Sequence, residues 1–192
     1  MPTDSVGVFA VLLRSTIKSG CKQNDTTRRD CDFSSSNPAT QCADGGCNGG
    51  LVCDPNTGTG VAPATLAEFT LSAAGNQDFY DLSLVDGFNL PVRIDNDQGC
   101  AVPQCAVDLG PNCPAPFQGP FNSTGFPLTQ KCGQYYTPQI CPSSGSAAYD
   151  YFKSNCPDAY AYAYDESSES ALGICDASLE ADYTITFCPA PE

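Results

Sequence analysis

The stretch that decides the fold is residues 65–94, TLAEFTLSAAGNQDFYDLSLVDGFNLPVRI. Its first part, residues 65–71, alternates between two faces, a period of two that is typical of a β-strand. Those faces carry Leu66 and Glu68 on one side, and Ala67, Phe69 and Leu71 on the other. Two further apolar runs, at residues 79–85 and 89–94, predict two more strands. Between them lies Asp86-Gly87, a dipeptide that commonly forms the turn of a hairpin.

The rest of the chain favours a mainly β fold with little helix. Turn residues separate short apolar runs throughout, with 17 Gly and 16 Pro among 192 residues. Residues 181–188 alternate again, with apolar or aromatic side chains on one face and threonines on the other. The one good helix candidate is residues 146–156, which Pro157 ends.

The cysteine content points to an extracellular, disulfide-stabilised protein. The chain has 13 cysteines, close to the density of known disulfide scaffolds. Because the cytosol keeps thiols reduced, such a density is typical of secreted proteins. A zinc site is a weak interpretation, because the chain has no histidine and no paired C-x-x-C motifs. We therefore expect no metal and no cofactor.

The charge balance and the absent residue types exclude several function classes. Eight Lys and Arg against 22 Asp and Glu give a net charge of −14, which disfavours nucleic acid and anionic membranes as partners. Without histidine, neither a Ser-His-Asp nor a Cys-His catalytic centre can form. No apolar run approaches the roughly 20 residues of a membrane-spanning helix.

The N-terminal region has two open interpretations. Residues 6–13 form an apolar run of the length of a signal-peptide core, but they lack a preceding basic stretch and a clear cleavage site. The same run fits an ordinary β-strand. Two N-x-[ST] sequons, at Asn24 and Asn122, are candidate glycosylation sites and agree with secretion.

Six ordered motifs lie between residues 29 and 189. They are CDF at 31–33, Cys42-x4-Cys47-x5-Cys53, PATLAEFTL at 63–71, FYDLSLVDGFNLPV at 79–92, CPDAYAY at 156–162 and FCP at 187–189. Together they resemble the thaumatin-like protein family, and they look closest to its fungal, basidiomycete-type members.

The resemblance implies a single thaumatin-like domain, with a flattened β-sandwich and two small disulfide-rich lobes, the second containing a short helix. The sandwich core would comprise residues 1–28, 70–106 and 157–192. The small lobe would be residues 29–69 and the helical lobe residues 107–156. Compared with the family, the N-terminal sandwich strands look incomplete and the helical lobe looks shortened.

The resemblance also implies a disulfide framework of five pairs. These are Cys31–Cys42, Cys47–Cys53, Cys100–Cys175, Cys105–Cys156 and Cys132–Cys141. Cys21, Cys113 and Cys188 lie outside these pairs, and Cys21–Cys188 is one conceivable further bridge. Because 13 is odd, at least one thiol is free or intermolecular.

The family's functional feature is an acidic cleft, and its carboxylates carry over here as Glu68, Asp81, Asp86 and Asp158. Two carboxylates suit the hydrolysis of a glycosidic bond, with one held protonated and the other ionised. Because Glu68 lies between Ala67 and Phe69, we expect it to be the acid and Asp81 the base. Tyr80 and Phe88 are candidate rings for stacking on a sugar.

These residues have simpler interpretations as well. With 22 acidic residues, any one carboxylate is most often a solvated surface group, and Asp158 after Cys-Pro could cap a turn. We expect a secreted, monomeric protein that binds β-1,3-glucan of fungal cell walls, with weak endo-β-1,3-glucanase activity as a further expectation. The alternatives are a non-catalytic antifungal or wall-binding protein and a truncated, inactive member of the family.

Overall fold

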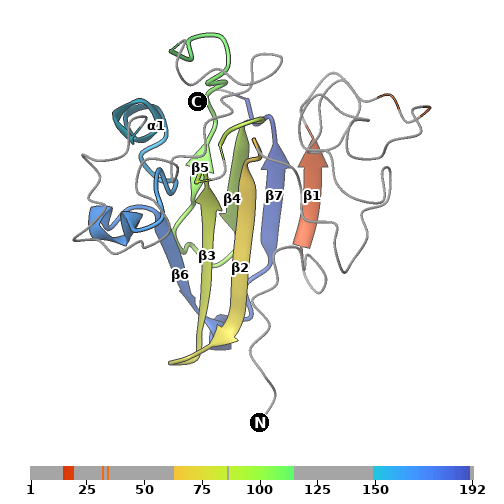
Figure 1. The fold of residues 1–192 in the computed structure, drawn as a ribbon. Coiled ribbons are helices and arrows are strands. Elements are labelled where there is room, and N and C mark those ends of the chain that lie inside the picture. Colours follow the sequence, from red (N-terminus) through yellow and green to blue (C-terminus); the bar gives the residue numbers. More distant parts are fainter. Residues whose placement is uncertain are drawn as a thin grey trace.

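The computed structural model describes residues 15–19, 32, 34, 63–85, 87–114 and 149–190, and of residues 15–19 it describes the backbone. As the sequence predicts, this part of the chain is mainly β with one short α-helix (Figure 1). Its elements are β1 (Ser15–Ser19), β2 (Leu66–Ala73), β3 (Gln77–Ser83), β4 (Val92–Asn96), β5 (Gln104–Cys105), α1 (Tyr149–Asn155), η6 (Asp165–Ser168), β6 (Leu172–Asp176), η7 (Ala177–Leu179) and β7 (Tyr183–Phe187), where η marks a 3-10 helix.

The described strands form two sheets. One has the strand order β1-β7-β4-β5 and the other β2-β3-β6. The pairing of β1 with β7 is parallel, whereas the other strand pairs are antiparallel. In Figure 1 the three-stranded sheet lies in front of the four-stranded one, with α1 to one side. Buried side chains from both sheets share the same clusters, so the arrangement is the expected β-sandwich.

The strands β2 and β3 form an antiparallel hairpin through a turn at residues 74–76. The backbone N–H of Asn76 closes the turn by donating to the Ala73 carbonyl at 3.1 Å. Gly75 and Asn76 have φ angles of 78° and 59°, a left-handed conformation that glycine and asparagine adopt most readily. This hairpin fixes which residues of β2 and β3 face each other.

Two details of these strands differ from the sequence prediction. The hairpin expected at Asp86-Gly87 is wrong, because β3 and β4 lie in different sheets and the chain between them crosses the sandwich. In addition, the register of β2 shifts between Thr70 and Ala73. Leu71 therefore leaves the buried face of its strand and is 51% exposed.

Two hydrophobic clusters fill the sandwich. The smaller one lies between the two sheets and contains Tyr80, Ile94, Cys175, Ala181 and Tyr183. The larger one extends from the sheets to α1 and contains Leu82, Leu84, Phe88, Val92, Cys105, Leu109, Phe152, Cys156, Ala159, Ala161 and Ile185. The alternation of β3, β4 and β7 thus supplies the core from one face of each strand.

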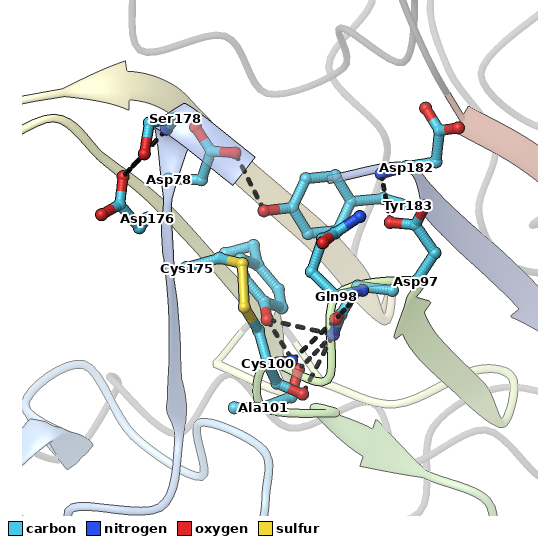
Figure 2. Close-up of a disulfide and its surroundings, with 12 residues drawn as sticks. Asp78, Asp97, Gln98, Cys100, Ala101, Cys175, Asp176, Ser178, Asp182 and Tyr183 are labelled. Carbon is cyan, nitrogen blue, oxygen red and sulfur yellow. Dashed lines mark hydrogen bonds between the residues drawn. A yellow bond between two sulfur atoms is a disulfide. The ribbon is translucent and has the colours of Figure 1, made fainter. Parts of the chain in front are cut away.

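One end of the sandwich is cross-linked by the Cys100–Cys175 disulfide, which joins the connection after β4 to β6 (Figure 2). Nearby, the Tyr183 hydroxyl on β7 donates to Asp78 Oδ2 on β3 at 2.9 Å. Both contacts connect the four-stranded sheet to the three-stranded one, so they hold the two layers in a fixed relation.

A second disulfide, Cys105–Cys156, ties β5 to the residue after α1. Phe152 on α1 is fully buried in the larger cluster, so the helix is held by packing as well as by the bridge. Both disulfides are pairs that the family resemblance implies. They link positions 75 and 51 residues apart, and the chain-entropy model assigns about 4 kcal/mol to loops of this size.

The sheet boundaries refine the expected division of the domain. Because β2 begins at Leu66, residues 66–69 belong to the three-stranded sheet, although the sequence division places them in the small lobe. Cys188, at the end of β7, is disulfide-bonded. In the described part of the chain, no helix is long and apolar enough to cross a membrane.

Several predictions fall outside the described residues. They concern the apolar run 6–13, the sequons at Asn24 and Asn122, the pairs Cys31–Cys42, Cys47–Cys53 and Cys132–Cys141, Cys21, and Asp86. These stay predictions.

Candidate functional site

A cavity of about 360 Å³ lies between β2, β3 and the segment 160–166. Its lining consists of Leu66, Glu68, Asp81, Ser83, Val85, Tyr160, Ala163 and Glu166. Three of these residues are acidic, and each comes from a different element: β2, β3 and η6. Among the residues that the structure describes, no basic side chain lines the cavity.

The pairing of β2 with β3 places the first two carboxylates side by side. Glu68 and Asp81 are directly opposite each other in the antiparallel register. Residues opposite each other on one face of such a pair have Cβ atoms about 4.5–5.5 Å apart. Because side chains alternate along a strand, Ala67 and Phe69 point the other way and pack against the core clusters.

Asp81 is a strongly perturbed carboxylate of the site. Its Oδ1 atom is buried and has no hydrogen-bond partner in the described part of the chain. Burial, followed by the negative charges of Glu68 and Glu166, raises the pKa of Asp81 from 3.8 to about 7. This carboxyl therefore holds its proton at pH values where an ordinary aspartate is ionised.

The third carboxylate, Glu166, is held beside Tyr160. The Tyr160 backbone is fixed to the end of β3, because its N–H donates to the Leu82 carbonyl at 2.8 Å and its carbonyl accepts from Leu84 N–H at 2.9 Å. Burial and the charge of Glu166 raise the pKa of the Tyr160 hydroxyl, which also hydrogen-bonds the Glu166 side chain. Tyr160 thus stays a neutral donor at the cavity wall.

The chain is similar to known proteins over most of its length. The chain matches the model of the Thaumatin family over residues 23–189. It belongs to the thaumatin family. It is 42% identical over 168 residues to pathogenesis-related thaumatin-like protein 3.7 of Cryptomeria japonica, a match that covers 84% of this chain and 68% of that protein.

Two other relatives of this thaumatin-family chain are similar at nearly the same level. Zeamatin of Zea mays is 38% identical over 175 residues, which cover 84% of this chain and 70% of zeamatin. Pathogenesis-related protein 5 of Arabidopsis thaliana is 38% identical over 174 residues, with 84% and 69% of the two chains covered. These three relatives are plant proteins.

Within this thaumatin-family site, the surroundings of Glu68 differ from those that its sequence neighbours suggest. The expected acid was Glu68, because Ala67 and Phe69 flank it in the sequence. Those neighbours face the core, however, and do not surround the Glu68 carboxylate. Burial raises the pKa of Asp81, which makes Asp81 a candidate acid, and the roles of the two carboxyls stay predictions.

The structure does not bring Asp158 to the cavity. Asp158 is half-buried and is not part of the lining, where Glu166 supplies the third carboxylate instead. The position of Asp86 lies outside the described residues. Of the four carboxylates expected from the resemblance, two are therefore neighbours in the cavity.

The expectation that the rings of Tyr80 and Phe88 stack on a sugar is not met. Both side chains are fully buried, so neither ring can contact a ligand. Tyr80 packs over Gly173 on β6, where an added Cβ would lie 2.7 Å from the Tyr80 ring. Its hydroxyl donates to the Ala101 carbonyl at 2.6 Å, which completes its role in the core.

Glu166 and Tyr160 line the cavity but are not predicted from the sequence. Glu166 lies in the polar run Asp165-Glu166-Ser167-Ser168, which has no period and looks like a solvated loop. Tyr160 lies in the CPDAYAY motif but was not assigned a role. Its proximity to the cavity follows from the parallel bridge between Tyr160 and Ser83, a tertiary contact that local sequence does not reveal.

Proposed function

We propose that this chain is a secreted, defence-type thaumatin-like protein that binds β-1,3-glucan of fungal cell walls in the acidic cavity. Family membership and the pathogenesis-related names of two relatives support the defence role. The proposal includes a fungal, basidiomycete-type origin, which rests on the motifs between residues 29 and 189.

The size and chemistry of the cavity support this proposal. Its volume of about 360 Å³ is within the range of small-ligand pockets, about 300–1,000 Å³. Glucan is uncharged and rich in hydroxyl groups, which can donate to carboxylate oxygens. The carboxyl groups of Glu68, Asp81 and Glu166 line the cavity and would supply such acceptors.

The observation that carries a hydrolytic role is the cross-strand pair of Glu68 and Asp81. Asp81, protonated up to a pH of about 7, would donate its proton to the glycosidic oxygen, and Glu68 would act on the opposite side as base or nucleophile. The directly opposed register keeps the two side chains close, which favours the short carboxyl separation of about 5–5.5 Å found in retaining enzymes.

Laminarin, a soluble β-1,3-glucan, tests the hydrolytic role. We expect slow release of reducing ends by the wild-type protein, and at least a tenfold slower release by Asp81→Asn and by Glu68→Gln. Asp150→Asn, which changes an exposed carboxylate on α1, is the matched control and should keep wild-type activity. Unchanged release by both cavity variants would overturn the catalytic assignment.

A binding role without hydrolysis is the second candidate. Among the described residues that line the cavity, Tyr160 is the aromatic one, and it is only 8% exposed. The cavity therefore offers little ring surface with which to bind and distort a sugar. Retention of the protein on insoluble β-1,3-glucan without release of reducing ends would support this role. Neither retention nor release, together with a non-cooperative unfolding transition, would indicate an inactive family member.

A further inference from the structure

The side chain of Asp165 is fully buried and connects three segments next to the cavity. Its Oδ2 atom accepts from Lys153 Nζ of α1 at 2.9 Å and from the backbone N–H of Ala161 at 2.8 Å. Its Oδ1 atom accepts from the Tyr149 hydroxyl, also on α1, at 3.2 Å. Lys153 in turn donates to the Ala159 carbonyl at 3.1 Å. One carboxylate thus joins α1, residues 159–161 and the start of η6.

This ion pair is adjacent in the chain to the residues that line the cavity. Asp165 is the first residue of η6, and Glu166, the second, supplies the third cavity carboxylate. The other end of the same segment is fixed at Tyr160, whose backbone is bonded to β3. The segment 160–166 is therefore fastened to the Asp81 strand at one end and to α1 at the other. Figure 1 shows η6 and α1 on the same side of the sandwich.

A role in stability alone leaves part of this arrangement unexplained. A buried ion pair is weak evidence for stability, because well-packed apolar residues often replace it without loss. Here the carboxylate accepts three hydrogen bonds from side chains and backbone of the elements around the cavity. An apolar replacement could fill the space, but it could not fix the backbone of Ala161 and the helix α1 to the same point.

We propose that Lys153 and Asp165 are positioning residues that hold Glu166 at the cavity opposite Asp81. This inference deepens the proposed function, since it assigns the helical lobe a part in organising the glucan site. Among the described residues, the titratable groups that act on Asp81 are Glu68 from β2 and Glu166 from η6, with Tyr160 on the wall between them.

The direction in which the pKa of Asp81 changes in Lys153→Met distinguishes the positioning of Glu166 from a direct electrostatic effect of Lys153. Loss of the Lys153 cation by itself would raise the pKa of a nearby acid, because a positive charge favours the ionised form. Displacement of Glu166 would lower the pKa of Asp81 instead, because one of the negative charges that raise it would move away. A lower Asp81 titration midpoint in Lys153→Met is thus the expected sign.

The test is a carbon-13 NMR titration of the Asp81 carboxyl in the full chain. Glu166→Gln should lower the midpoint directly. Lys153→Met should lower it by at least half as much, and should give no further decrease when combined with Glu166→Gln. Lys153→Arg, which retains the cation, should restore most of the wild-type midpoint. Arg93→Met, which removes the Arg93–Asp95 ion pair on β4, should leave it unchanged.

Tyr149→Phe is a milder variant that keeps the ion pair and removes one hydrogen bond to Asp165. Tyr149→Phe should lower the titration midpoint of Asp81 by a smaller amount than Lys153→Met. If Lys153→Met does not fold, Tyr149→Phe replaces it in the test. The proposal is overturned if folded variants do not shift the midpoint, or if they shift it equally in the Glu166→Gln background. The titration needs no glucan, so failure to bind laminarin would refute the proposed ligand and leave this result standing.

Discussion

Two aspartates of β3 have opposite surroundings although they are three residues apart. Asp78 is 6% exposed and faces the interior, where it accepts from Ser72 N–H at 2.7 Å and from the Tyr183 hydroxyl at 2.9 Å. Asp81 faces the cavity, where its buried Oδ1 atom has no partner among the described residues. The negative charges of Glu68 and Glu166 add to the effect of burial on its pKa.

The difference shows that donors, and not burial alone, decide what a buried carboxylate does. Asp78 receives hydrogen bonds that stabilise its charge and join two sheets, so it serves the fold. Asp165 belongs with Asp78, since Lys153, Tyr149 and a backbone N–H satisfy it completely. Asp81 receives no such compensation in the described structure, and its proton is therefore available for chemistry near neutral pH.

The largest expected effect comes from removing the charge of Asp165. In Asp165→Asn, the Lys153 ammonium loses its counter-charge although its side chain is only 15% exposed. Breaking one partner of a buried pair typically costs about 3–5 kcal/mol. We expect a decrease of that size in the free energy of unfolding, measured by urea denaturation at pH 7.

The exposed Asp150 on the same helix provides the control for this variant. Asp150→Asn should change stability by less than about 0.5 kcal/mol, as is usual for exposed substitutions. If Asp165→Asn proved equally harmless, Asp165 could not be grouped with Asp78 as a structural carboxylate.

Asp81→Asn should raise the free energy of unfolding, opposite to Asp165→Asn, and the size of this increase should depend on pH. Because the folded state raises the pKa of Asp81 to about 7, the unfolded chain ionises first as the pH rises above 3.8, and wild-type stability falls until about pH 7. The amide does not ionise and avoids this loss. We expect its stability advantage to grow by about 2–3 kcal/mol between pH 5 and pH 8, measured by urea unfolding.

Asp95→Asn, which changes a carboxylate outside the cavity, is the comparison for this pH series. Between pH 5 and pH 8, the difference in free energy of unfolding between Asp95→Asn and the wild type should not increase comparably. A constant difference between Asp81→Asn and the wild type at pH 5 and pH 8 would mean that Asp81 is ionised like an ordinary aspartate.

The strand pattern of the core could be predicted because local period determines which face is buried. Residues 65–71 and 181–188 alternate in the sequence, and β2 and β7 form there. The shared face of Leu66 and Glu68 is also correct, since both line the cavity. The helix predicted at residues 146–156 contains α1, and Cys156 follows its last residue directly.

The site could be predicted only in part because tertiary contacts complete it. The period of β2 identified the face of Glu68, but the residues that surround its carboxylate come from β3 and η6. Tyr80 looked available for a ligand because sequence does not show that Gly173 on a distant strand leaves room for its ring. Glu166 has no periodic context at all, and it follows Asp165, whose ion pair with Lys153 is a tertiary contact.

The smallest expected effect concerns the hydrogen bond between Asp78 and Tyr183. Asp78→Asn should cost about 1–2 kcal/mol at pH 7, because a hydrogen bond to a charged group is replaced by a neutral one. Tyr183→Phe should cost a similar amount, and a double-mutant cycle should give a coupling of about 1 kcal/mol, since Asp78→Asn weakens the contact that Tyr183→Phe removes. Additive costs would mean that the two sheets are held together without this bond. If the prediction holds, at pH 7 Asp78→Asn lowers the free energy of unfolding and Asp81→Asn raises it. Two aspartates on one strand would therefore respond to the same substitution with opposite signs, because one carboxylate is satisfied by donors and the other is not.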